Sequence, residues 1–440
     1  MSNRRRRPRS GPRPWNRARA LLLALAVSGC ATPPQVDTGL VRAMAKADPQ
    51  TRLQLLEAQD ARVSGHPFVG GNRVALLRNG PASFAAMEQA IAGATRRIDM
   101  ESYIFGRKEG TLFARLLLHK RAEGVEVNLV YDAWGSQDTP AALFRALRAG
   151  GVHVLEFNPL GLNPRVPIDL NRRDHRKLLV ADDRIAITGG VNISRVYRNT
   201  RPPPGTAADA ETLPWRDTDI EIEGPAVAEF ERLFMQTWRA QKGPPIPPPP
   251  PSAGWRRGDA LVEAIEGAPG RHRPAIYRTL LDAIALARHS VHLTTGFFAP
   301  TPELLRVLEQ AARRGVDVRI IVPVHSTSSL AIAAGRADYG ALLRAGVHIL
   351  QRRGVVLHAK TAVIDGDYSL VGSANLDWRS VVYNNEIDAV VIGRAFGRQM
   401  EALFRADAAR STAVRLRAWQ GRPLGERLEE WLAGAIEPLL

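Results

Sequence analysis

The sequence predicts an α/β fold that is built twice, as two tandem domains in one chain of 440 residues. One observation is a repeated motif, since HRKLLVADDRIAITGGVN, which begins at His175, matches HAKTAVIDGDYSLVGSAN, which begins at His358. The matched polar positions are His175/His358, Lys177/Lys360, Asp182/Asp365, Gly189/Gly372 and Asn192/Asn375. Another observation is that segments typical of helices and strands alternate in the same order before and after a proline-rich stretch. Equal spacing in two copies indicates one ancestral unit used twice, and the alternation indicates layered α/β domains.

Residues 1–29 are predicted to be a lipoprotein signal peptide. They hold eight arginines and no acidic residue, and the arginines precede an apolar stretch that is too short to span a bilayer comfortably. The stretch ends in Val-Ser-Gly-Cys30, which resembles the bacterial lipobox, whose cysteine is diacylated and becomes the new N-terminus. Cys30 is the only cysteine of the chain, so it has no partner for an internal disulfide. A plain signal peptide and a basic arm that binds nucleic acid are the alternatives.

The charge and the N-terminus together indicate a membrane-anchored protein of the bacterial cell envelope. The net charge is +16, and without the N-terminal arginines the rest of the chain carries +8, which suits anionic partners such as phospholipid headgroups or nucleic acid. Lipidation of Cys30 would hold the protein on the periplasmic face of a membrane. Ala31 follows the cysteine, in place of the aspartate that retains many such lipoproteins in the inner membrane, so delivery to the outer membrane is compatible with the sequence.

The expected domains follow the repeat. Residues 30–70 are expected to be an envelope linker with a helical segment, residues 71–242 the first α/β domain and residues 255–440 the second. In the first domain a helix end is followed by an apolar strand at Ala90–Phe105, Arg121–Asp132 and Leu147–Phe157. The counterparts in the second domain are Ala283–Phe298, Ala312–Pro323 and Leu343–Gln351.

Two proline-rich segments interrupt this pattern. Residues 243–254 are expected to link the domains, and Arg201–Pro214 to form a surface loop in the first domain. Proline runs favour extended polyproline geometry and are excluded from sheets and helix interiors.

Near the C-terminus, apolar residues recur at helical spacing, at Leu424, Leu428, Trp431, Leu432 and Ile436. Two interpretations are open. The apolar stripe packs onto the body of the protein, or it lies in a membrane interface.

The repeated motif has the pattern of a strand, a turn and a returning strand. Alternate side chains of a strand share a face, so His358 and Lys360 are expected to point the same way and reach one small anion together. Asp365 precedes glycine in a dipeptide typical of hairpin turns. We therefore expect Asp365 and its counterpart Asp182 to bond turn or neighbouring backbone groups. The second strand ends in a glycine turn that can present Ser373, Asn375 and backbone N–H groups to the same anion; its first-half counterpart carries Asn192.

The paired HxKxxxxD motifs, each followed by Gly-[Gly/Ser]-x-Asn, resemble the phospholipase D superfamily. Longer stretches, among them RRDHRKLLVADDRIAITGGVNI and LHAKTAVIDGDYSLVGSANLDWRS, are similar to bacterial cardiolipin synthases, and the similarity covers residues 72–410. The sequence departs from that family at Asp174, where asparagine is usual, and at Gly190, where serine is usual. The resemblance implies two tandem phospholipase D-like α/β domains, related by pseudo-twofold symmetry, with one shared active site.

The resemblance also implies a mechanism. One histidine attacks the phosphodiester phosphorus to form a phosphohistidine, and the other protonates the leaving alcohol and deprotonates the incoming one. In this family the histidine of the first motif is usually the nucleophile, which would make His175 the nucleophile and His358 the general acid and base. The sequence itself leaves this order open. Lys177 and Lys360, with Asn192, Ser373 and Asn375, would bind the phosphoryl oxygens. No metal and no cofactor are expected, because the lysines supply fixed cations and no HExxH or cysteine cluster occurs.

Two carboxylates are predicted to orient the histidines. A catalytic histidine usually needs a carboxylate that fixes its tautomer. Glu386 follows the second motif, and Asp217 is its counterpart after the first, once the 14-residue segment Arg201–Pro214 is allowed for. The alternative is that both are ordinary loop acids.

The expected function is a phosphatidyltransferase that makes cardiolipin from phospholipids, with phosphatidylglycerol as the acceptor. Its partners would be phospholipid substrates and the membrane surface, reached through lipidated Cys30, and not nucleic acid. The alternatives are a phospholipase D that transfers the group to water, a nuclease of the same superfamily and a non-catalytic envelope lipoprotein. Two motifs in one chain, the lipobox and the synthase-like flanks argue against the nuclease.

Overall fold

The computed structural model describes residues 48–159, 171–198, 213–247, 255–269, 274–326 and 328–435. The predicted signal peptide and Cys30, together with most of both proline-rich segments, lie outside the described residues.

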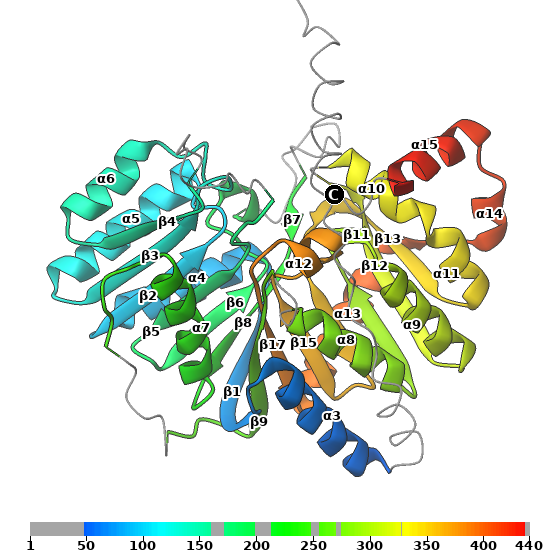
Figure 1. Ribbon diagram of the computed structural model, residues 1–440, viewed down its shortest axis with the longest axis horizontal. Coiled ribbons are helices and arrows are strands. Elements are labelled where there is room, and N and C mark those ends of the chain that lie inside the picture. The colour runs from blue at the N-terminus through cyan, green and yellow to red at the C-terminus, as the bar shows by residue number, and fades with distance from the viewer. Residues whose placement is uncertain are drawn as a thin grey trace, which may run out of the picture. The chain divides into compact units, whose positions relative to one another are not determined.

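One continuous sheet, with 16 strands in the described residues, runs through both halves of the chain (Figure 1). The first half contributes β1 (Val69–Arg78), β2 (Arg97–Ser102), β3 (Glu126–Asp132), β4 (His153–Phe157), β5 (Lys177–Ala181), β6 (Ile185–Gly189) and β8 (Thr218–Glu223). The second half contributes β9 (Ala260–Gly267), β10 (Ser290–Thr294), β12 (Asp317–His325), β13 (His348–Leu357), β14 (Thr361–Ile364), β15 (Tyr368–Gly372), β17 (Glu386–Ile392) and the edge strand β18 (Ser411–Ala413).

The order of the strands confirms the predicted duplication. The first half runs β1-β8-β6-β5-β2-β3-β4, and the second half runs β9-β17-β15-β14-β10-β12-β13, so corresponding strands occupy corresponding places. The halves meet where β1 and β9 pair antiparallel. One short strand crosses between them, because β7 (Trp215–Arg216) of the first half pairs with β13 of the second.

Helices cover both faces of the sheet. In the first half these are α4 (Asn79–Gly93), α5 (Arg107–Ala122), α6 (Ala141–Ala149) and α7 (Val227–Ala240). Their counterparts in the second half are α8 (Ala275–Leu286), α9 (Pro302–Arg313), α11 (Tyr339–Ala345) and α13 (Arg394–Ala408). All the segments that the sequence predicts as a helix followed by a strand are formed. In the first half α4 precedes β2, α5 precedes β3 and α6 precedes β4. In the second half α8 precedes β10, α9 precedes β12 and α11 precedes β13.

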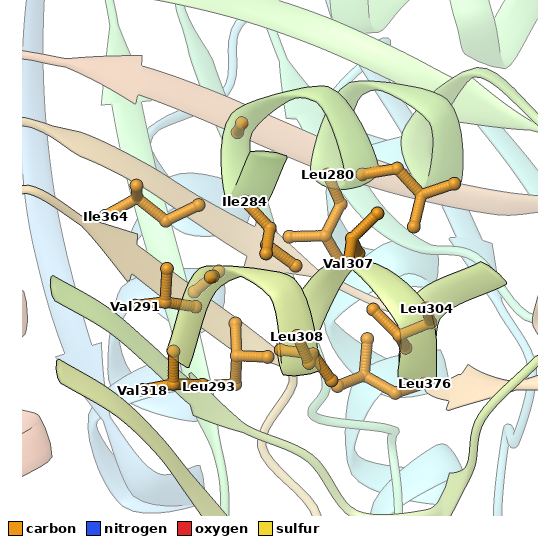
Figure 2. Packing of buried hydrophobic residues seen from close by; sticks show 14 of the residues in the cluster. Leu280, Ile284, Val291, Leu293, Leu304, Val307, Leu308, Val318, Ile364 and Leu376 are labelled. Carbon is orange, nitrogen blue, oxygen red and sulfur yellow. The ribbon is translucent and has the colours of Figure 1, made fainter. Parts of the chain in front are cut away.

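Alternate side chains of the motif strands bury into separate cores on the two faces. Ala362 and Ile364 of β14 pack into the core beneath α8 and α9, whereas Val363 packs into the core beneath α7 and α13. Figure 2 shows the first of these cores, in which Leu280 and Ile284 of α8 and Leu308 of α9 lie over the strand residues. Burial on both faces explains why these strands are almost continuously apolar.

The N-terminal helical segment is a docked helix. Helix α3 (Pro49–Ser64) packs against α8 of the second half, where Gln59 Nε2 donates to Asp282 Oδ2 at 2.9 Å. Tyr368 Oη donates to Asp60 Oδ2 at 3.0 Å. Within the described residues no helix is long and apolar enough to cross a bilayer.

The C-terminal helix exposes its apolar stripe. Helix α15 (Leu424–Ala435) packs against α10 (Ser329–Ala337) through the buried residues Glu430 and Ala433. Its large apolar side chains are exposed, at Leu424, Leu428, Trp431 and Leu432, and Ile436 lies outside the described residues. Packing of this stripe onto the protein body, one of the two interpretations of the sequence, is therefore wrong.

Candidate active site

The two motif histidines lie just before the strands that the motifs predict. Strand β5 begins at Lys177 and β14 at Thr361, so the expectation that His358 and Lys360 both lie within one strand is corrected. The backbone at the histidines is instead bonded across the halves. His175 N donates to Asn385 O at 2.9 Å, and His358 N donates to Arg216 O at 2.8 Å.

Both histidines lie at the carboxyl ends of parallel strands. Lys177 pairs with Ser102 at the end of β2, and Thr361 pairs with Thr294 at the end of β10. Strands β2 and β10 run parallel to β3 and β12, respectively. This edge of an α/β sheet is where ligands usually bind, and we call it the active-site edge.

Each histidine is held by a carboxylate from the other half. His175 Nδ1 lies 2.9 Å from Glu386 Oε2, and His358 Nδ1 lies 2.7 Å from Asp217 Oδ2. Both carboxylates are fully buried, and the histidines are 8% and 7% exposed. A carboxylate on Nδ1 fixes the tautomer, so the Nε2 lone pair of each ring is left for chemistry. The sequence identified all four residues, but not that the pairs cross between the halves.

The two carboxylates differ in the number of hydrogen bonds that they accept. Glu386 also accepts hydrogen bonds from Ser373 Oγ at 2.6 Å, Ser380 Oγ at 2.9 Å and Asn384 Nδ2 at 3.1 Å. Asp217 accepts in addition one backbone bond, from Thr218 N at 2.8 Å. Ser373, which we expected at the phosphate, therefore donates to the carboxylate that orients His175.

Glycine at position 190, where the family usually has serine, has a steric reason. A Cβ atom at this position would lie 2.2 Å from Asp217 Oδ1, so no side chain fits there. Gly190 corresponds to Ser373, and Asp217 is one methylene shorter than its counterpart Glu386. The first half thus combines a short carboxylate with glycine, and the second half combines a long carboxylate with serine.

Aspartate at position 174, where the family usually has asparagine, lies in surroundings that favour its protonated form. Asp174 is fully buried, and this burial, together with the nearby Glu101 carboxylate, raises its pKa well above the ordinary range. A raised pKa favours the protonated acid, which can donate a hydrogen bond as the amide of the usual asparagine does.

Burial sets the charge of the histidines. Desolvation, with repulsion from Lys177, lowers the pKa of His175 to about 4 even though Glu386 opposes the shift. The same causes, with Lys360 as the neighbouring cation, lower the pKa of His358 to about 3. Burial alone would raise the pKa of Glu386, but the attraction of His175 keeps it below the ordinary value. At neutral pH the histidines are therefore neutral and their carboxylates ionised.

The two lysines lie beside the histidines. Lys177 Nζ donates to His175 O, and Lys360 Nζ donates to His358 O. Burial lowers the pKa of Lys177 to about 7 and that of Lys360 to about 8, although Glu386 and Asp217 oppose the shifts. Both cations are thus close to losing a proton near neutral pH.

These lysines predict the alkaline side of the pH profile. A lysine is charged below its pKa, so the cations that attract a phosphate are lost as the pH rises through about 7 to 8. We expect kcat/KM, which reports the free enzyme, to fall across this range when it is measured with dispersed dibutyryl phosphatidylglycerol. Lys177→Arg should lower the activity but move the fall to higher pH, because arginine keeps its charge. A profile that stays flat well above pH 8 would contradict the assignment.

Asparagine and aspartate residues hold the glycine turns. Asn192 Oδ1 accepts from Ile104 N at 3.1 Å and its Nδ2 donates to Tyr197 Oη at 3.0 Å, while Asn375 N donates to Ser380 Oγ. Asp219 accepts from Val191 N, and Asp388 accepts from Ser373 N and Ala374 N. The sequence reasoning missed Asp219 and Asp388. The signal was present, because each follows an orienting carboxylate by two positions in both halves.

Tyr197 is a third residue that the sequence did not indicate. Its hydroxyl lies 3.3 Å from His358 Nδ1, and its ring contacts those of His358 and Trp215 edge-on. Beside His175 the corresponding aromatic contact comes from Tyr103. Nothing in the motif spacing links these tyrosines to the histidines.

Asp182 and Asp365 lie in tight turns away from the histidines. Asp182 accepts from the backbone N–H groups of Thr95, Arg96 and Arg97 at 2.7–2.9 Å. Asp365 accepts in the same way from Arg288, His289 and Ser290. Each carboxylate ties its turn to the segment that enters β2 or β10, which is the structural role expected from the sequence.

Removing one of these carboxylates should destabilise the fold. We expect Asp182→Ala to lower the free energy of unfolding by about 2 kcal/mol, since hydrogen bonds to a charged group contribute roughly 1.5–3 kcal/mol. Asp182→Asn retains an acceptor oxygen and should lose less. Denaturant unfolding followed by circular dichroism measures both. Equal stability of Asp182→Ala and the unsubstituted protein would show that these bonds contribute nothing.

The described residues contain no group of three histidine, cysteine, aspartate or glutamate side chains placed to hold a metal ion. The site is made of two histidine–carboxylate pairs and two lysines, repeated about the junction of two similar halves. This fold and this site define the phospholipase D-like class.

Comparisons with known proteins narrow the class. The family described as "Cardiolipin synthase, PLD-like domain" matches residues 87–200 and 280–408, and the chain belongs to this family. It is 34% identical over 356 residues to cardiolipin synthase A of Pseudomonas aeruginosa, covering 80% of this chain and 70% of that protein. It is 30% identical over 383 residues to the cardiolipin synthase of Geobacillus kaustophilus, covering 86% and 74%. The fold is shared with the phosphatidylserine synthase of Haemophilus influenzae, at a TM-score of 0.66 and 12% identity over 88% of this chain and 100% of that one.

Proposed function

We propose that this protein is a phosphatidyltransferase that makes cardiolipin. It would move a phosphatidyl group from one phospholipid to the glycerol headgroup of phosphatidylglycerol. The observation that carries the proposal is the crossed arrangement of two buried histidine–carboxylate pairs at one edge of the sheet, in a member of the cardiolipin synthase family. A double displacement at phosphorus needs one neutral histidine as the nucleophile and one protonated histidine as the general acid, and both rings have Nε2 available for these roles.

In the first step, His175 Nε2 attacks phosphorus and the bond from phosphorus to the leaving alcohol breaks. His358 enters this step as the imidazolium, which the negative charge of the bound phosphate favours, and it gives its Nε2 proton to the departing oxygen. In the second step, His358 takes the proton from the incoming hydroxyl, whose oxygen bonds to phosphorus as the phosphorus–nitrogen bond breaks. Lys177 and Lys360 would stabilise the phosphoryl oxygens, helped by Asn192 and Asn375. Their charge would in turn be held by the bound phosphate, because an anion raises the pKa of nearby cations.

The hydrogen bonds to the two carboxylates and the pKa values of the two histidines point to opposite orders. Glu386 accepts hydrogen bonds from two serines and an asparagine and lies against His175. Among the described residues, the carboxylate of Asp217 has His358 and one backbone N–H as its hydrogen-bond partners. A less shared carboxylate attracts an imidazolium more strongly. The pKa values run the other way, at about 3 for His358 and about 4 for His175. The order of the two roles therefore rests on the family resemblance, and the position of the covalent adduct tests it.

Lipid analysis of a bacterial strain that lacks cardiolipin tests the function. Expression of this chain should make cardiolipin appear in the lipid extract. A His175→Ala/His358→Ala double variant, expressed at the same level, should not. Accumulation of phosphatidic acid without cardiolipin would replace the transferase by a hydrolase, and an unchanged lipid profile would reject both.

We further propose that Cys30 is lipidated and anchors the protein on the periplasmic face of a bacterial membrane, with the outer membrane as the destination compatible with Ala31. The lipobox and the single cysteine support this. Cys30→Ala should abolish incorporation of radiolabelled palmitate and leave a signal peptide that is unprocessed or cleaved elsewhere. Ser28→Ala, in the same lipobox, is the matched control. Label that still enters the Cys30→Ala protein would overturn the assignment.

A further inference from the structure

Helix α15 is a two-faced helix whose apolar face is open. Leu424, Leu428, Trp431 and Leu432 are 78%, 57%, 66% and 54% exposed. They recur at spacings of three and four, so they form one stripe along the helix. The opposite face is fixed to the protein, since the buried Glu430 binds Arg336 of α10 at 2.9 Å and also pairs with Arg422. The helix therefore presents a stripe of leucine and tryptophan on a rigid support.

The other large apolar side chains that are exposed in the described residues lie at the same edge as the histidines. Leu112 belongs to the second turn of α5, which follows β2, and Trp134 follows β3 by two residues. Leu330 lies in the first turn of α10, which follows β12. Val196 precedes Tyr197, whose hydroxyl reaches His358. Exposed apolar residues from both halves thus gather at the active-site edge.

Helix α15 is joined to this edge through packed neighbours. It packs on α10, and α10 packs on β11 (Phe298–Ala299), which pairs with β16 (Leu376–Asp377) directly after Asn375. Figure 1 shows α15 and α10 on the same margin of the sheet as β7, the strand next to Asp217. Helix α15 is thus linked to the surroundings of the site through α10, β11 and β16.

The charged side chains near the exposed apolar residues are mostly basic, which suits an anionic surface. In α5, α10 and residues 133–139, 194–197 and 414–435, the exposed lysines and arginines are Arg107, Lys108, Arg115, Arg195, Arg415, Arg417 and Arg427. They outnumber the exposed acidic side chains of the same segments, which are Asp138, Glu426 and Glu429. On α15 itself the exposed Glu426 and Glu429 outnumber the exposed Arg427, so the excess of positive charge comes from the neighbouring segments. Exposed apolar side chains beside basic residues suit the interface of a membrane with anionic lipids.

We propose that this face, formed by α15 with Leu112, Trp134, Val196 and Leu330, docks onto an anionic phospholipid bilayer and brings the active-site edge to the headgroups. The inference rests on the proposed function, in which the substrates are phospholipids. Docking places the histidines at the level of the phosphodiesters, so a substrate does not have to leave the bilayer completely.

The test uses the full chain on vesicles of phosphatidylglycerol and phosphatidylcholine whose acyl chains are brominated, which quench nearby tryptophans. Quenching should occur in the unsubstituted protein and be smaller in Trp431→Phe. Leu428→Gln/Trp431→Gln should lower turnover of long-chain phosphatidylglycerol in vesicles at least about tenfold, because burial of two large apolar side chains is lost. Turnover of dispersed dibutyryl phosphatidylglycerol should stay unchanged. The matched control, Glu426→Gln/Glu429→Gln on the same helix, should keep both activities.

Several outcomes would overturn the docking. They are equal quenching in Trp431→Phe, equal vesicle turnover in the Leu428→Gln/Trp431→Gln variant, or a change from oligomer to monomer in that variant, which would assign the face to a second copy. If the unsubstituted protein turns over neither substrate, the proposed function fails, and the quenching of Trp431 still decides whether the face meets lipid.

Discussion

His358→Ala should react once with a nitrophenyl phosphodiester and then stop. Without its general acid, the enzyme must expel an alkoxide unassisted, and general acid–base help is typically worth about 10²–10⁴-fold. Nitrophenolate is a good leaving group and needs no such help, so the first displacement on His175 should still occur. The second displacement needs a base for the incoming alcohol and should stall. We expect a burst of about one nitrophenolate per active site, followed by turnover reduced by about 10²–10⁴-fold.

His175→Ala is the matched comparison, because it removes the nucleophile and leaves the acid. It should give no burst and no covalent product. Mass spectrometry of the burst product of His358→Ala should place the phosphoryl adduct on His175. An adduct on His358 of the His175→Ala variant would exchange the two roles, and full turnover in both variants would mean that the site lies elsewhere.

The crossed pairs predict that Glu386→Gln damages His175 and that Asp217→Asn damages His358. Each substitution replaces a carboxylate that lies 2.7–2.9 Å from Nδ1 with an amide, which no longer fixes the tautomer or favours the cation. A comparable change in a histidine–aspartate pair of serine proteases costs about 10⁴-fold in turnover. We expect losses of roughly 10²–10⁴-fold with natural phospholipids in both variants.

The nitrophenyl substrate separates the two variants. Asp217→Asn should retain the burst, because His175 and Glu386 are intact, and Glu386→Gln should lose it. If each carboxylate served the histidine of its own half, the pattern would be reversed. Ser380→Ala, which removes one hydrogen bond from Glu386 and leaves the carboxylate in place, should show a much smaller loss and keep the burst.

The duplicated fold and the residues of the site follow from the sequence because both depend on short-range patterns. The spacing of His358, Lys360 and Asp365 is local, and the repeat doubles the signal. Alignment of the two repeats, with the segment Arg201–Pro214 allowed for, then places Asp217 and Glu386 at corresponding positions. Their assignment as partners of histidine needed only the chemistry of imidazole.

The crossing of the pairs depends on contacts that no local pattern contains. Asn385 bonds the backbone at His175, and Arg216 bonds the backbone at His358, although each pair is far apart in sequence. The same limit applies to Tyr197, which reaches His358 only after the chain has folded. The strand begins only at Thr361, later than the pattern predicts, because the backbone of His358 bonds Arg216 of the other half and not a neighbouring strand of its own half.

The crossed pairs also constrain how such a protein could have evolved. A single half contains a histidine and a carboxylate that do not meet, so an unduplicated ancestor could have completed its site only as a symmetric dimer, with two identical pairs. After two copies were fused into one chain, the two histidine–carboxylate pairs no longer had to be identical in sequence. One half then came to hold Asp217 with Gly190, while the other holds Glu386 with Ser373. Gly190 leaves the space that Asp217 occupies, and Ser373 donates a hydrogen bond to Glu386. The two members of each combination are therefore expected to change together across descendants, even though each combination serves the histidine of the opposite half.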